Sequence, residues 1–287
     1  MKKLLLFLTI LSGTSFSSFS QQDPNFSSDG FTPFLNNPAA TGSLNRFSVN
    51  AIFRNQWPAI PNQNKIMAFM VEGNTKFRFK SSEQQFNMPI GLNVILEKYG
   101  LLRIHTINVP ISIPIKLRNS TLAMGISTGI KRIEFDSTLL SFGDPIQLQN
   151  STELDLNTGV FWYGENHYLG FSITNFTAQN IGGFKRVRHF NFNAGYKFKI
   201  GKHYLFPMLN GTFVDGSNLI RSVVYFQFKE DIFSIGAGLS PRNSYSLAAT
   251  VKIKQFKLAY VYDYFTSSLS NASGRSYEFR LSYAIAK

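Results

Sequence analysis

The sequence is 287 residues long and contains no cysteine, which excludes disulfide bonds, a lipid-modified N-terminal cysteine and thiolate metal sites. Charged residues make up only 16% of the chain and aromatic residues 15%, whereas an average soluble protein contains about 25% charged residues. The formal net charge is +13, but the Lys and Arg residues are spread along the chain and form no nucleic-acid-binding motif. Such a charge instead suits acidic partners or lipid phosphates.

The first twenty residues have the pattern of a cleavable secretory signal peptide. Lys2 and Lys3 give a positive start, an apolar core runs from Leu4 to Leu11, and small residues lead to Ser20. This core is shorter than the roughly 20 residues that a membrane-spanning helix needs, so it is a targeting segment and not an anchor. We therefore expect export, with cleavage near Ser20.

The next segment, residues 21–43, differs from both the signal peptide and the rest of the chain. Pro24, Pro33 and the Asn37-Pro38 step exclude a regular strand or a long helix. The segment nevertheless contains several Phe residues and is apolar enough to pack. We expect an ordered but irregular arm.

From residue 44 onward, apolar and polar residues alternate with the period of two that is typical of a β-strand. The stretches 88–96, 190–198, 256–264 and 277–283 show this most clearly, because aromatic and aliphatic residues share one face and mostly polar or small residues the other. A barrel in a membrane requires this alternation, since one face meets acyl chains and the other meets a polar lumen.

Fourteen such segments can be distinguished, and bacterial single-chain barrels have an even number of strands. With the N-terminus in the periplasm, the long connections lie on the external side and most periplasmic turns are short, as expected of such barrels. A secreted β-sandwich, the alternative all-β fold, gives no reason for this asymmetry. The expected strands are 44–54, 65–77, 86–97, 101–117, 120–135, 153–163, 167–175, 189–199, 203–214, 219–229, 232–239, 244–254, 256–265 and 275–285.

The sequence therefore predicts an all-β protein, a transmembrane antiparallel β-barrel of about 14 strands with a short N-terminal arm. Its expected parts are a signal peptide at 1–20, a periplasmic arm or plug segment at 21–43, and an outer-membrane barrel at 44–287. Three roles remain open for the arm. The first is to enter the barrel as a plug, the second is to dock a periplasmic partner, and the third is only to seal the barrel floor.

No group of residues indicates catalysis or metal binding. Residues 125–129 match the Gly-x-Ser-x-Gly nucleophile pattern, but that pattern needs a strand-to-helix turn and here lies inside an alternating strand. The four histidines are not spaced as a metal pair. We expect no enzymatic activity, no metal and no cofactor.

Three motifs in the first part of the mature chain go together. They are Gln22-Asp23-Pro24, Asn37-Pro38 followed by small residues and Gly42, and Phe53-Arg54-Asn55-Gln56-Trp57. With these motifs, and with residues 258–283 as a closing hairpin, the chain closely resembles the PorP/SprF family of outer-membrane proteins. The resemblance covers the mature chain nearly from end to end.

The resemblance implies a barrel linked to type IX secretion and gliding motility, located in the outer membrane. It implies that the barrel delivers or anchors secreted surface proteins that carry type IX C-terminal sorting domains. Its further expected neighbours are periplasmic and lipoprotein components of the same system, together with outer-membrane lipid. An outer-membrane pore or uptake channel for small solutes remains the alternative, and a lipid-modifying barrel enzyme is a third possibility without a visible site.

The expected partner-binding residues lie in the arm and at the external end of the first strand. Trp57 could contact a secreted partner or anchor at the membrane interface, and Asp263 is expected to pair with a basic residue of the lumen. The expected set is Asp23, Pro24, Phe31, Pro33, Phe34, Asn37, Pro38, Arg54, Asn55 and Trp57.

Overall fold

The computed structural model of the chain describes residues 26–28, 33–44, 46–59, 64–78, 85–136, 150–177, 180–181, 184–185, 187–214, 217–229, 231–240, 244–266 and 275–286. The expected signal peptide lies outside the described residues, and so do Asp23, Pro24 and Phe31. Within the described part of the chain, no helix is long and apolar enough to cross a membrane.

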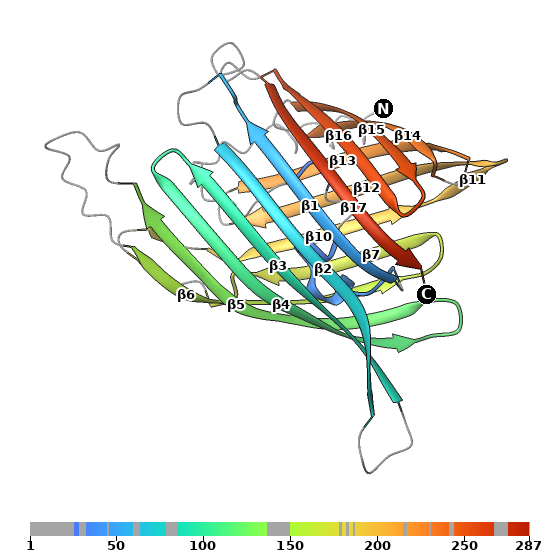
Figure 1. The fold of residues 1–287 in the computed structure, drawn as a ribbon, viewed down its shortest axis with the longest axis horizontal. Coiled ribbons are helices and arrows are strands. Elements are labelled where there is room, and N and C mark those ends of the chain that lie inside the picture. Colours follow the sequence, from blue (N-terminus) through green and yellow to red (C-terminus); the bar gives the residue numbers. More distant parts are fainter. Residues whose placement is uncertain are drawn as a thin grey trace, which may run out of the picture.

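Fourteen antiparallel strands close into a β-barrel, as predicted (Figure 1). The strands β10 and β11 both pair with β12 and together make one barrel strand. The bounds are β1 (Arg46–Gln56), β2 (Asn64–Arg78), β3 (Gln85–Tyr99), β4 (Leu102–Lys116), β5 (Thr121–Phe135), β6 (Ser151–Tyr163), β7 (His167–Thr174), β10 (His189–Tyr196), β11 (Phe198–Ile200), β12 (His203–Val214), β13 (Ser217–Phe228), β14 (Phe233–Ser240), β15 (Ser244–Ile253), β16 (Phe256–Phe265) and β17 (Arg275–Ala286).

The barrel closes where the first strand meets the last. β1 pairs with β17 over ten residue pairs, from Arg46 opposite Ala286 to Asn55 opposite Tyr277. Each of the remaining barrel strands pairs with the barrel strand before it and the one after it, so the sheet has no free edge along its main length. Closure matters because an open sheet edge would expose unpaired backbone groups to the bilayer.

The two faces of the sheet have opposite chemistry. Large apolar side chains such as Leu247, Ile253 and Leu239 are exposed on the outer face, whereas buried Ser, Thr, Asn and charged residues face the lumen. This arrangement is inverted relative to a soluble protein, and it follows from the alternation along each strand.

The two ends of the barrel also differ. One end, here the short-turn end, carries the connections at 79–84, 117–120, 164–166, 201–202, 229–232 and 254–255. The other, the long-loop end, carries three short connections, 100–101, 215–216 and 241–243, and the four longest ones, 57–63, 136–150, 175–188 and 266–274. A small hairpin of β8 (Asn180–Ile181) and β9 (Phe184–Lys185) lies in the third of these long connections. Exposed aromatic residues lie at strand ends of both ends of the barrel, as in interfacial girdles, with Phe190, Phe213, Tyr245 and Tyr264 toward the long-loop end and others toward the short-turn end. Those toward the short-turn end include Trp162, Tyr196, Phe198, Phe233 and Phe256.

The predicted eighth strand, 189–199, is interrupted in the structure. The backbone N–H of Lys197 donates to the carbonyl of Asn166, at 2.7 Å, instead of bonding to the adjacent strand. The break divides the strand into β10 and β11. The alternation in the sequence continues through it and could not reveal it.

Candidate functional site

The described part of the N-terminal arm lies inside the barrel. We name residues 26–28 and 33–44 the lumen segment. It contains two short 3₁₀ helices, η2 (Pro33–Leu35) and η3 (Pro38–Ala40). Asn37 caps η3, since its side chain accepts a hydrogen bond from the N–H of Ala39 at 3.0 Å, and proline at the first helical position has no N–H to leave unpaired.

The two 3₁₀ helices are bound to the wall formed by β4 to β7. The amide of Asn37, which is fully buried, donates to the carbonyls of Val160 at 3.0 Å and Phe171 at 3.3 Å. The hydroxyl of Ser112 donates to the carbonyl of Ala39 at 3.0 Å. These bonds satisfy buried polar groups that would otherwise destabilise the packed lumen.

Glycines on the wall allow the segment to approach the strands closely. A Cβ atom on Gly125 of β5 would overlap the backbone of Pro38 and Ala39, and one on Gly159 of β6 would overlap the side chain of Asn37. The Gly-x-Ser-x-Gly motif is therefore strand sequence, as expected, and its first glycine makes room for the lumen segment.

Residues 26–28 are held nearer the long-loop end by a buried group of charges, here called the anchor cluster. Arg54 lies 2.7 Å from Asp263 and 3.3 Å from Glu278, so the expected pairing of Asp263 with a basic residue is confirmed. Two further residues complete the cluster, because Arg221 donates to the carbonyl of Phe26 at 2.8 Å and Arg280 donates to that of Ser28 at 3.4 Å.

The acids of the anchor cluster bind the segment directly. Glu278 accepts hydrogen bonds from the backbone N–H of Ser27 at 2.6 Å and of Ser28 at 3.0 Å, and from the Ser28 hydroxyl. The hydroxyl of Ser27 donates to Asp263 at 2.6 Å. A third acid, Glu72, accepts from the N–H of Gly42 at 2.7 Å near the other end of the segment. Strand side chains therefore fix both ends of the lumen segment.

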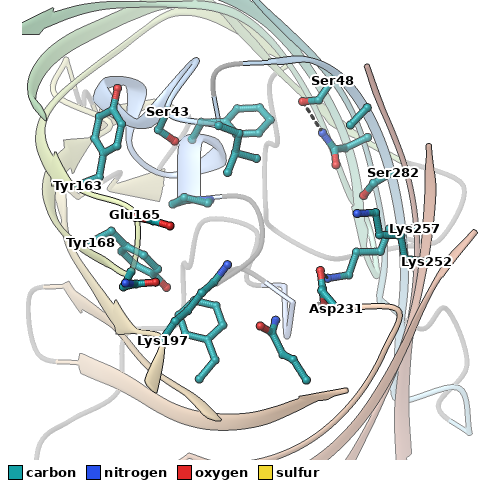
Figure 2. A pocket seen from close by; sticks show the side chains of 18 of the residues that line it. Ser43, Ser48, Tyr163, Glu165, Tyr168, Lys197, Asp231, Lys252, Lys257 and Ser282 are labelled. Carbon is teal, nitrogen blue, oxygen red and sulfur yellow. Dashed lines mark hydrogen bonds and ion pairs between the residues drawn. The ribbon is translucent and has the colours of Figure 1, made fainter. Parts of the chain in front are cut away.

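A cavity of about 620 Å³ lies between the lumen segment and the short-turn end. We name it the mouth cavity. Pro33 and Phe34 form part of its wall, and the side chains of Lys197, Lys252 and Lys257 reach into it (Figure 2).

The family assignment follows from the sequence match. The family model for the type IX secretion system membrane protein PorP/SprF matches residues 18–283. The chain belongs to the PorP/SprF family. It is therefore an outer-membrane barrel of type IX secretion, as expected from the resemblance. No curated protein matches the sequence.

Solved structures similar to this PorP/SprF chain share little sequence with it. The outer membrane protein Omp33 of Acinetobacter baumannii is 9% identical with a TM-score of 0.50, and the match covers 84% of this chain and 98% of Omp33. A triple mutant of the Rhodopseudomonas blastica porin is 8% identical with a TM-score of 0.39, covering 84% and 99% of the two chains. CdiB from Acinetobacter baumannii is 9% identical with a TM-score of 0.46, covering 84% and 60%. The likeness to Omp33 supports the fold alone.

The structure separates the expected partner-binding residues into two groups. Asn37, Pro38, Arg54 and Asn55 are buried, and the hydrogen bonds of Asn37, Arg54 and Asn55 run to other residues of the barrel and the lumen segment. Trp57 is half-buried at the long-loop end, where its ring contacts Phe265 edge-on.

Sequence reasoning missed the acids Glu72 and Glu278, which hold the segment. Both occupy polar-face positions of otherwise alternating strands, and Glu278 pairs in register with Arg54, so opposite charges on neighbouring strands were the available signal. Within the described residues, no group of three His, Asp or Glu side chains could hold a metal ion.

Proposed function

We propose that this PorP/SprF chain acts in type IX secretion by binding, so that it delivers or anchors secreted surface proteins that carry C-terminal sorting domains. In this proposal the long-loop end faces the cell exterior and meets the secreted protein. The short-turn end faces the periplasm and meets other components of the secretion system. The lumen segment acts as a plug between the two ends.

The observation that carries this proposal is the occupied lumen. The segment packs against β4 to β6 and is hydrogen-bonded at both of its ends to buried charged side chains. With the segment filling part of the lumen, the surfaces at the two ends of the barrel are left to bind other proteins. A plugged barrel is a poor starting point for a passive solute pore, which needs a water-filled channel.

The channel alternative retains one observation in its favour, the mouth cavity, which occupies part of the lumen. Single-channel recording of the purified barrel in a planar bilayer distinguishes the two functions. A steady ionic conductance from the intact chain would favour the channel, and a closed barrel favours binding.

The direct test is affinity purification of a tagged copy from its native envelope in mild detergent, followed by mass spectrometry. We expect recovery of a large secreted protein with a C-terminal sorting domain, or of type IX lipoproteins. A barrel recovered alone, and conducting in the bilayer, would overturn the proposal.

A second test removes residues 22–43 in the native host. We expect the barrel to reach the outer membrane but the cognate surface protein to be missing from the cell surface, because the plug and its contacts are lost. Heat-dependent migration on gels checks that the barrel still folds. Unchanged surface display in a folded, truncated barrel would contradict the role of the arm.

A further inference from the structure

The mouth cavity is lined by an excess of positive charge. Five basic residues contribute to its wall, Lys197, Lys252, Lys254, Lys257 and Arg280, against the two acids Glu165 and Asp231. Asp231 is engaged by Lys257, at 2.6 Å. A concave, water-accessible space with this charge balance attracts anionic groups.

The lysines face the cavity and not the bilayer, because alternate residues of a strand point to opposite faces. Lys252 shares the inner face of β15 with the buried Thr250, whereas the neighbouring Ile253 is exposed on the outer face. Lys257 likewise shares the inner face of β16 with the buried Ala259. The positive charge therefore faces the inside of the barrel and not the lipids around it.

The lysines come from opposite walls. Figure 2 shows Lys197 directed into the cavity from one side and Lys252 and Lys257 from the other, with Tyr168 beside Lys197. Cations separated in this way do not converge on one small anion as a phosphate site requires. They suit an extended ligand that carries several carboxylates.

The cavity also offers an apolar surface. Phe34, Phe161 and Phe206 line it together with Tyr168, and the Lys197 ammonium lies 5.2 Å from the centre of the Phe206 ring. Aromatic walls with a few polar groups are typical of ligand-binding cavities, and the volume of about 620 Å³ lies within the usual range for them. A ligand that matches both features of the cavity carries acidic groups and, in addition, an apolar or aromatic group.

We propose that the mouth cavity binds an acidic, aromatic-containing peptide segment of a periplasmic protein. This inference deepens the proposed function, on which it rests for the periplasmic side of the short-turn end, by naming the chemistry of that partner. The peptide backbone supplies an extended shape, its carboxylates meet the two walls of lysines, and an aromatic side chain packs against the aromatic residues of the cavity.

The experiment measures binding of a fluorescent synthetic peptide of alternating Glu and Gly with one central Phe to the purified full-length barrel in zwitterionic detergent. We expect saturable binding that weakens as ionic strength rises, and no binding of the same peptide with Gln in place of Glu. The double variant Lys197→Gln/Lys252→Gln should bind the peptide at least about tenfold more weakly, because it removes one charged partner from each wall.

The matched control is Arg118→Gln/Lys202→Gln, which removes the same charge from exposed turns of the short-turn end that do not line the cavity. An equal loss of binding in both double variants would show bulk charge attraction and overturn the site. Competition by millimolar inorganic phosphate, or by nanodiscs of phosphatidylglycerol but not phosphatidylcholine, would overturn the peptide assignment in favour of a phosphate or a lipid headgroup.

The outcomes also separate this inference from the proposed function. If the peptide does not bind but the tagged barrel recovers type IX proteins, only the inference fails. If the peptide binds at the cavity and no type IX proteins are recovered, the cavity assignment stands and the proposed function fails.

Discussion

At the scale of single residues, Arg54 is the side chain whose removal should destabilise the folded barrel most. It is only 3% exposed and lies between Asp263 and Glu278, which are both buried. Replacing Arg54 by Met removes the guanidinium that pairs with both buried carboxylates, and breaking a buried ion pair in this way costs about 3–5 kcal/mol. We expect Arg54→Met to unfold at a clearly lower temperature in detergent. The measurement is the temperature at which the band of the folded barrel shifts to the position of the unfolded chain on a gel.

The matched control for this prediction is Arg103→Met. Arg103 also pairs with a carboxylate, Asp136, at 2.6 Å, but it is 47% exposed. Exposed ion pairs contribute only about 0–1 kcal/mol, so the control should unfold near the temperature of the intact chain. Equal destabilisation by the two substitutions would contradict the anchoring role of Arg54.

Gly125 provides a residue-level test of the packed lumen. A leucine there would collide with the backbone of Pro38 and Ala39, so the lumen segment should be displaced while the strand keeps its pairing. Because the chain has no cysteine, the single substitution Ala40→Cys reports on this displacement. We expect faster labelling of Cys at position 40 by a polar maleimide in the Gly125→Leu background.

The control for Gly125→Leu is Met124→Leu, which changes the adjacent lipid-facing residue and adds no volume to the lumen. It should leave the labelling rate unchanged. Slow labelling in both variants would mean that the segment adapts to the added side chain, and the close approach at Gly125 would then not be essential.

At the scale of elements, the proposed plug role of the lumen segment can be tested by replacing the segment. Replacing residues 33–43 by a Gly/Ser linker of equal length removes the contacts of Asn37 and Ala39 with the wall, and flexible linkers of this composition do not pack. We expect the replaced barrel to conduct ions in a planar bilayer at levels well above the intact chain. An intact β-barrel, judged by heat-dependent migration, with no gain in conductance would contradict the plug role.

The elements also show what local sequence can and cannot predict. The alternation along each strand predicted fourteen strands with bounds close to those observed, because the period of two is a property of neighbouring residues. The position of the lumen segment depends on distant residues, since Asn37 bonds to a carbonyl 123 residues away and Ser27 to a carboxylate 251 residues away. Contacts of that separation leave no periodic pattern in a single sequence.

The same distinction applies to the candidate site. The pairing of Asp263 with a basic residue was predictable, because an acid on the polar face of a barrel strand needs a partner. The choice of Arg54 follows from the registers of β1, β17 and β16, which sequence alone does not give. The three hydrogen bonds that Glu278 makes to the segment depend on where the segment lies in the lumen, which the sequence does not give either. The four lysines of the mouth cavity come from four different strands or turns, and no single one of them indicates a site in the sequence.

At the scale of the whole molecule, the orientation in the membrane determines what each end can bind. The longest connections, 57–63, 136–150, 175–188 and 266–274, all lie at one end, and outer-membrane barrels direct long loops outward and short turns to the periplasm. The basic mouth cavity then opens toward the periplasm, and residues 26–28 lie nearer the external side. Both proposals therefore depend on this orientation.

Single cysteines at the two ends test the orientation directly. Thr266→Cys lies where β16 meets a long loop, and Asn119→Cys lies in the short turn between β4 and β5, both exposed. In intact cells, a membrane-impermeant maleimide should label Thr266→Cys, because it faces the medium, and should reach Asn119→Cys only after the outer membrane is permeabilised. The reverse pattern would place the mouth cavity at the cell surface, where its acidic ligand would have to be part of a secreted protein and not of a periplasmic one.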